Sequence, residues 1–181
     1  MLRQRTHRAF FLSTRLLGAS SALSLLAASA LARAESLPTI THISLDLAQK
    51  ASGEALRKCQ TDGYRISVSV VDRSGVLVLA ARSDGAGPHT VDSSRRKAYT
   101  AASLREPTQK LAEIASGSPD MRELGDMNES ILLLGGGFPI KISGDVVGGL
   151  GVGGAPGAKL DEACARAGLQ SIGADLYESP K

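Results

Sequence analysis

The chain has 181 residues, with 21 Lys and Arg, 18 Asp and Glu, a formal net charge of +3 and 3% aromatic residues. This length allows one domain with a hydrophobic core of its own. Five of the basic residues precede residue 35 and all the acidic residues follow residue 34, so residues 35–181 carry 16 minus 18 charges, a net charge of −2. A negatively charged domain with few aromatic rings argues against a nucleic acid as a partner.

The N-terminal segment is organised like an export signal. Arginines without any acidic neighbour precede an apolar run at 16–31, and Ala32-Arg33-Ala34 then has the small-x-small pattern of a cleavage site. The run is rich in Ser and Ala and shorter than the about 20 strongly apolar residues of a transmembrane helix. We therefore predict a signal peptide at residues 1–34, a single domain at 35–181, a periplasmic or secreted location and no stable membrane span after processing. An uncleaved N-terminal anchor is the alternative.

The first predicted elements are a helix and a β-hairpin. Ser44 is a favourable N-cap residue, and the apolar residues after it recur at helical spacing until the helix ends near residues 61–63. The segment 64–71 alternates and is rich in Val and Ile, which indicates a strand. A turn at 72–75 joins it to a second strand at 76–81, so the two form a hairpin.

The rest of the domain is predicted to contain three helices and about three strands. The first of these helices follows a Gly- and Pro-rich loop, has small residues on its inward face and ends before Pro107. In chain order the expected elements are helices at 91–104 and 109–115, strands at 131–134, 138–143 and 146–152, and a last helix at 159–176. Strands joined by tight turns pair antiparallel. The predicted fold class is therefore α/β, more closely α+β, with about five antiparallel strands flanked by helices.

Two cysteines follow the predicted signal peptide. Cys59 and Cys164 fall on the apolar faces of the first and last predicted helices. An even number of cysteines in an oxidising compartment favours a disulfide, and we predict one between these two residues. Two buried, unpaired thiols are the alternative. The spacing of the two cysteines matches no common metal-binding motif.

The chain lacks the familiar catalytic signatures. We find no nucleophile elbow, no HExxH and no Ser-His-acid set in a suitable context, so an enzyme is not predicted. The segment 149–154 fits the pattern GxGxxG of dinucleotide-binding proteins. That fingerprint needs a second strand after the following helix, and only 27 residues (181 minus 154) remain after Gly154. We therefore interpret these glycines as positions where a strand bends and a helix packs closely.

His89 is the strongest candidate for a ligand. It stands on the Gly- and Pro-rich loop at the start of a predicted helix, and Arg95, Arg96 and Lys97 follow it. An imidazole can ligate haem iron, and nearby cations can hold the haem propionates. An exposed histidine beside a solvated basic helix face is the competing interpretation of the same residues. His42, in the segment before the first helix, is interpreted as part of a solvated terminus.

Several short motifs, standing in order, resemble one known family. They lie at 70–75, 81–86, 97–102, 136–140, 148–154 and 161–169. In this order and spacing they resemble the GlcG/HbpS family of haem-binding proteins, whose domain is also the C-terminal domain of PduO-type proteins. The resemblance runs from about residue 44 to residue 176. It implies a profilin-like sheet of about five antiparallel strands, self-assembly into homo-oligomers and no common set of catalytic residues.

The resemblance also implies a ligand, because some family members bind haem or related tetrapyrroles. We therefore expect an exported haem- or tetrapyrrole-binding protein that acts in haem sensing or sequestration. His89 would be the axial metal ligand, with Arg95, Arg96 and Lys97 as further cofactor-binding residues near the propionates. The alternative is a cofactor-free interaction or scaffold subunit of the cell envelope. A small-metabolite enzyme using the glycines at 135–137 is a third, weaker hypothesis.

Overall fold

The computed structural model describes residues 36–177, and the predicted signal peptide lies outside this range. All the helices and strands described below belong to one compact unit that starts at Ile40. Within this unit, no helix is long and apolar enough to cross a membrane.

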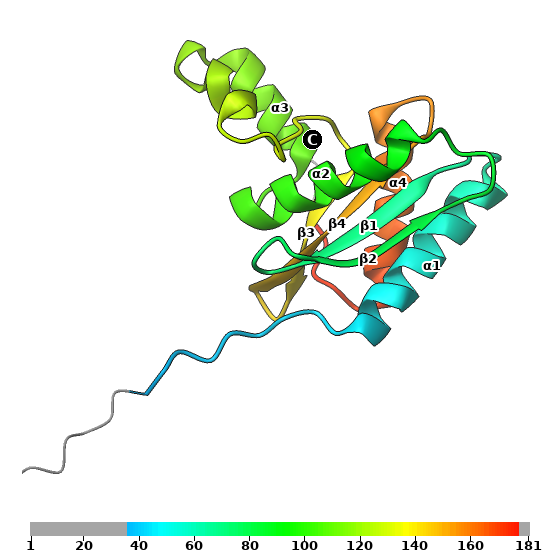
Figure 1. The fold of residues 1–181 in the computed structure, drawn as a ribbon. Coiled ribbons are helices and arrows are strands. Elements are labelled where there is room, and N and C mark those ends of the chain that lie inside the picture. Colours follow the sequence, from blue (N-terminus) through cyan, green and yellow to red (C-terminus); the bar gives the residue numbers. More distant parts are fainter. Residues whose placement is uncertain (1–35, 178–181) are drawn as a thin grey trace, which may run out of the picture. The chain divides into compact units, whose positions relative to one another are not determined.

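A four-stranded antiparallel sheet forms the centre of the unit (Figure 1). Its strands are arranged in the order β2-β1-β4-β3, with the bounds β1 (Ser67–Asp72), β2 (Leu77–Arg82), β3 (Gly137–Ile142) and β4 (Asp145–Gly153). The predicted hairpin of β1 and β2 is confirmed. In its turn, the Asp72 carboxylate accepts hydrogen bonds from the backbone N–H groups of Ser74 and Val76. This pattern holds the turn tightly. The sheet therefore joins one hairpin from each half of the chain.

The predicted strand at 131–134 does not form, so the sheet has four strands where about five were expected. This segment is tied to the helices by side chains. Thr100 Oγ1 accepts a hydrogen bond from the Leu132 N–H at 2.8 Å, the Arg96 guanidinium donates to the Ile131 carbonyl at 2.6 Å, and Thr108 Oγ1 donates to the Leu134 carbonyl at 2.7 Å. Because these side chains satisfy the backbone, the segment needs no neighbouring strand.

Helices cover both faces of the sheet. α1 and α4 lie together on one face, α2 lies across the other face, and α3 with the 3₁₀-helix η1 projects beyond the sheet (Figure 1). Their bounds are α1 (Leu45–Thr61), α2 (His89–Leu104), α3 (Thr108–Gly117), η1 (Pro119–Asp126) and α4 (Ala158–Ser171). The fold class predicted from the sequence is confirmed.

The helix ends have local causes. Ser44 caps α1 as predicted, because its hydroxyl accepts a hydrogen bond from the Leu47 N–H at 3.3 Å. α4 ends five residues earlier than predicted. Gly173 adopts a left-handed conformation (φ +69°), and the next residue, Ala174, donates its N–H to the Leu169 carbonyl. This is the usual glycine-based end of a helix.

The face of the sheet under α1 and α4 holds the main hydrophobic core. Val68, Val70, Leu150 and Val152 point into it, and small residues of the helices pack against them. The predicted disulfide is confirmed, since Cys59 of α1 and Cys164 of α4 are bonded with their Cα atoms 5.5 Å apart. The bridge joins the two helices that cover this face.

The face under α2 is built from glycines and hydroxyl residues instead. A Cβ atom added at Gly151 would lie 2.1 Å from the Ser94 carbonyl oxygen, and one added at Gly149 would lie 2.2 Å from the Ala98 carbonyl oxygen. Ser69 and Ser94 are joined by a hydrogen bond of 2.8 Å across the same contact. The helix backbone therefore rests almost directly on the strand backbone. This packing accounts for the first two glycines of the GxGxxG pattern. The third, Gly154, has a φ of +129°, and an added Cβ there would lie 2.7 Å from the Arg65 carbonyl oxygen.

Candidate functional site

His89 is the first residue of α2, and its side chain is exposed. Thr90 fixes the start of the helix, because both its N–H and its hydroxyl donate to the Gly87 carbonyl, at 3.0 and 2.6 Å. The imidazole lies over Gly87, where an added Cβ would be 2.6 Å from the ring atom Cε1. Among residues 36–177 the imidazole nitrogens have no hydrogen-bond partner. His89 is thus an accessible nitrogen donor on a rigid helix end.

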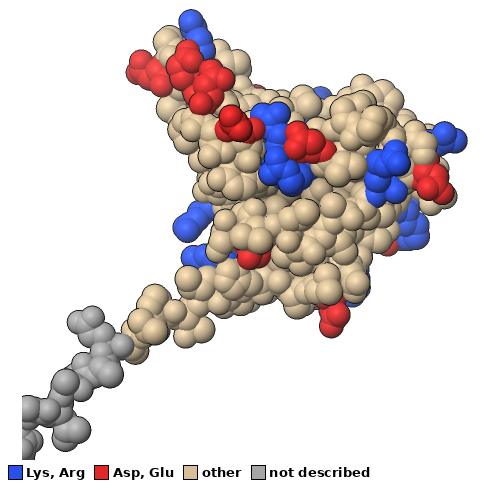
Figure 2. Space-filling model, in the orientation of Figure 1, with Lys and Arg blue, Asp and Glu red and all other residues tan. Residues whose placement is uncertain are grey.

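Arg95 and Arg96 lie further along α2. Arg96 is seven residues from His89, which places it two turns away on the same face of the helix, about 10 Å along the axis. Its side chain is half-buried, and its Nε atom is buried. The Arg95 guanidinium forms an ion pair with Asp92 at 3.0 Å, and both side chains are partly exposed. In Figure 2, positive side chains lie over α2, whereas acidic side chains gather over the projecting α3–η1 segment. His89, Arg95 and Arg96 therefore share one helix, and the Arg96 guanidinium already donates to the Ile131 carbonyl at 2.6 Å.

Lys97 turns to the opposite side of the same helix. Its side chain is buried, and its ammonium group donates to Asp161 Oδ2 at 2.8 Å and to the Val152 carbonyl at 2.9 Å. The second carboxylate oxygen of Asp161 accepts the N–H of Ala155 at 3.0 Å. Burial raises the pKa of Asp161, and the charge of Lys97 opposes this effect. Lys97 thus joins α2 to α4 and is not grouped with His89, so its role at a propionate stays a prediction.

The other candidates occupy separate places. His42 precedes α1, is partly exposed, and has its Nδ1 atom 3.7 Å from Asp72 Oδ2. Glu162 of α4 is half-buried, and burial raises the pKa of its carboxyl. Within the described part of the chain, no group of three or more His, Cys, Asp or Glu side chains is arranged to hold a metal ion.

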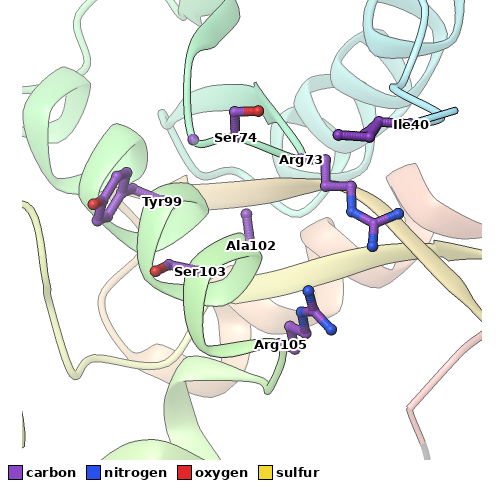
Figure 3. A pocket seen from close by; sticks show the side chains of 8 residues that line it. Ile40, Arg73, Ser74, Tyr99, Ala102, Ser103 and Arg105 are labelled. Carbon is purple, nitrogen blue, oxygen red and sulfur yellow. The ribbon is translucent and has the colours of Figure 1, made fainter. Parts of the chain in front are cut away.

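Sequence reasoning missed a pocket at the other end of α2. It has a volume of about 270 Å³ and lies between the β1–β2 turn and the C-terminal end of α2 (Figure 3). Its lining includes two arginines, Arg73 and Arg105, which are far apart in the sequence. No sequence pattern points to it, because the left-handed backbone of Arg105 (φ 59°) at the end of α2 is visible only in the structure. That conformation is usually taken by glycine.

The fold and the sequence together identify the family. This antiparallel α/β unit matches the family model described as "Haem degrading protein HbpS-like" over residues 43–170. The chain belongs to the HbpS-like family. The resemblance to the GlcG/HbpS family predicted from the motifs is therefore confirmed.

Curated relatives agree with this assignment. A 15.0 kDa protein of uncharacterised function from Citrobacter freundii, named for the dhaT-dhaS intergenic region, is 33% identical over 116 residues, which is 64% of this chain and 82% of the relative. Protein GlcG of Escherichia coli K12 is 28% identical over 116 residues, covering 64% and 84% of the two chains. Neither name states a ligand.

Solved structures share the fold. A double mutant of Streptomyces reticuli HbpS is 43% identical, with a TM-score of 0.71 and coverage of 80% of this chain and 96% of HbpS. A complex of PduOC with haem is 21% identical, with a TM-score of 0.70 and coverage of 76% and 100%. At that identity the likeness to PduOC shows the fold alone. The description of the matching family model names haem.

Proposed function

We propose that this protein binds haem or a related tetrapyrrole outside the cytoplasm, in haem sensing or sequestration. Membership of the HbpS-like family carries the proposal. The chemistry of the α2 surface fits the ligand, because His89 offers an unpartnered imidazole and the guanidinium groups of Arg95 and Arg96 lie about two turns away on the same helix. Bound haem would supply the iron centre, and His89 would be the residue that holds it.

The protein residues would have distinct roles. The imidazole of His89 would coordinate the iron, and its position over Gly87 at the fixed helix end would orient the ring. Arg95 and Arg96 would hold the carboxylates of the propionates by charge-assisted hydrogen bonds. The exposure of His89 suits a site on the surface or between subunits, and the scarcity of aromatic residues agrees with this.

A haem titration of the purified protein, followed by absorbance, tests the proposal. We expect a saturable Soret shift with the wild type. His89→Ala is expected to lose this shift or to move the Soret maximum. His42→Ala is the matched control, because it removes the other described histidine and should bind haem like the wild type. A time-dependent loss of the Soret band in the wild type would add haem breakdown, the activity in the family description, to the proposed binding.

Two results would contradict the proposal. An unchanged Soret band and affinity in His89→Ala would remove this residue from the iron. A titration of the wild type without a Soret shift would exclude haem as the ligand.

Export and self-assembly are part of the proposal. The Cys59–Cys164 disulfide supports an oxidising compartment, which agrees with a signal peptide at 1–34. N-terminal sequencing of the protein from the periplasm or medium is expected to begin at Glu35. Light scattering of the purified protein is expected to give the mass of a homo-oligomer. A purified chain that begins at Met1 would contradict cleavage of the signal peptide. A monomeric mass would contradict self-assembly.

One feature favours the second candidate, a cofactor-free interaction subunit. The α3–η1 segment projects from the sheet (Figure 1) and exposes Ile114, Met121 and Met127, the last of them 63% exposed. Exposed apolar side chains with acidic neighbours are typical of a surface that meets another protein. A flat haem titration, together with a partner that binds the wild type but not Met127→Glu, would favour this function.

A further inference from the structure

We propose that the pocket between the β1–β2 turn and the end of α2 binds a small organic carboxylate. Arg73 reaches into it from the turn, and Arg105 reaches into it from the helix end, so the two guanidinium groups point toward a common space (Figure 3). A guanidinium group recognises a carboxylate through two parallel hydrogen bonds. This site is separate from His89, which stands at the opposite end of α2.

The charges of the pocket are uncompensated within the described residues. Neither Arg73 nor Arg105 forms an ion pair or a side-chain hydrogen bond there. The neighbouring acids are engaged elsewhere: Asp72 accepts two backbone N–H groups of its own turn and lies near His42, and Glu106 pairs with Lys110 at 3.1 Å. Two guanidinium groups that face one pocket without a neighbouring carboxylate favour the binding of an anionic ligand.

The backbone of Arg105 supports a role for its side chain. Arg105 ends α2 in the left-handed conformation, which is strained for a residue other than glycine. Glycine would end the helix without this strain. The Tyr177 hydroxyl donates to the Arg105 carbonyl at 3.0 Å and holds the strained residue in place. The fixed helix end therefore holds Arg105 beside the pocket.

The shape of the pocket depends on small residues. Gly75 lies against the ring of Tyr99, where an added Cβ would be 2.7 Å from the ring. Ala102 also lines the pocket, so a larger side chain there would reduce the space. The volume of about 270 Å³ lies just below the usual range for drug-sized ligands. The ring of Tyr99 and the side chain of Ile40 add apolar surface to the lining, which suits a short carbon chain attached to the carboxylate.

Isothermal titration calorimetry of the full protein with sodium malonate tests the site, with sodium chloride at the same ionic strength as the reference. We expect saturable binding of one malonate per chain. Arg73→Gln and Arg105→Gln should each weaken it at least about tenfold, because each removes a charge-assisted contact. Arg122→Gln is the matched control: it removes an exposed arginine of η1, outside the pocket, and should bind like the wild type.

Three results would overturn the proposal: no saturable binding of malonate, an equal loss in Arg122→Gln, or unchanged binding in Arg73→Gln, whose position in the β1–β2 turn lies outside the hydrophobic core. Saturation by inorganic phosphate but not by malonate would also overturn the assignment to a carboxylate.

The carboxylate could come from a free small acid or from a haem propionate, and a second titration distinguishes them. Malonate that still binds after haem has been added identifies a free acid, whereas malonate displaced by haem identifies a propionate. Both results support the pocket as a carboxylate site. The malonate titration needs no haem, so a flat haem titration would leave this proposal standing.

Discussion

The two faces of the sheet are packed in different ways. Under α1 and α4, branched apolar side chains such as Val70 and Leu150 fill the space, and a disulfide joins the two helices. Under α2, glycines and serines such as Gly151 and Ser69 bring the helix backbone against the strands. The first face is stabilised by buried apolar area and a covalent bond. The second face depends on close fit, and it fixes the helix that carries both candidate sites.

The α2 face also contains a buried ion pair. Lys97 and Asp161 lie beside Gly136, where an added Cβ would be 3.0 Å from the Lys97 ammonium nitrogen. The pair joins α2 to the start of α4, so it connects the layers on opposite faces of the sheet. Variants that remove one of these contacts at a time measure how much each face of the sheet contributes to the stability of the fold.

The largest effect is expected on the α1/α4 face, from loss of the disulfide. The double variant Cys59→Ala/Cys164→Ala opens a loop with a sequence separation of 105. In the chain-entropy model this costs about 4–5 kcal/mol of unfolding free energy. Urea unfolding measures the loss. Adding a reductant to the wild type should give a similar loss and should leave the double variant unchanged; a reductant effect on that variant would point to another cause.

The next effect is expected from Lys97→Met, which leaves the Asp161 carboxylate buried without its cation. We expect a loss of about 3–5 kcal/mol at neutral pH, because an unpaired buried charge is costly. The variant Lys97→Met/Asp161→Asn should recover most of this loss, because no charge then remains buried. Urea unfolding of both variants beside the wild type checks the difference.

The stability of the Lys97→Met variant should also change with pH in a defined direction. In the folded chain burial raises the pKa of Asp161, so the folded state binds the proton more tightly than the unfolded state. Without Lys97, the difference between the pKa of Asp161 in the folded and unfolded states becomes larger. The stability of Lys97→Met should therefore fall as the pH rises from the ordinary value for Asp, about 3.9, through the raised pKa. A loss that does not change with pH would contradict an unpaired Asp161.

A smaller effect is expected from Gly151→Ala, which tests the close fit under α2. The added Cβ would lie 2.1 Å from the Ser94 carbonyl oxygen and 2.6 Å from the Ala98 nitrogen, so the helix must move away from the strand. We expect a loss of about 2–3 kcal/mol in urea unfolding. Because α2 carries His89, haem affinity should weaken as well if the proposed site is correct.

The matched control for Gly151→Ala is Gly53→Ala. Gly53 is exposed in the middle of α1 and has no atom within 4 Å of an added Cβ. Alanine there should raise stability by about 0.5–1 kcal/mol, because glycine is a poor helix former. A loss at Gly53 similar to that at Gly151 would mean that close packing is not the cause.

The sequence by itself determined the local elements. Ser44 and the spacing of the apolar residues after it predicted α1, the turn at 72–75 predicted the hairpin of β1 and β2, and the positions of Cys59 and Cys164 predicted the disulfide. These features depend on hydrogen bonds and periodicity within short segments, and the sequence displays both directly. The ordered motifs also indicated the family.

Only the tertiary structure decided where the polar groups of distant segments meet. The residues at 131–134 are apolar enough for a strand, but side chains from α2 and α3 bind their backbone. Lys97 belongs to the same basic run as Arg95 and Arg96, yet it is buried because its partner Asp161 lies 64 residues away. The pocket of Arg73 and Arg105 has no sequence pattern, because the packing of α2 on the sheet creates it. Contacts between distant segments depend on how the elements pack, which local periodicity does not record.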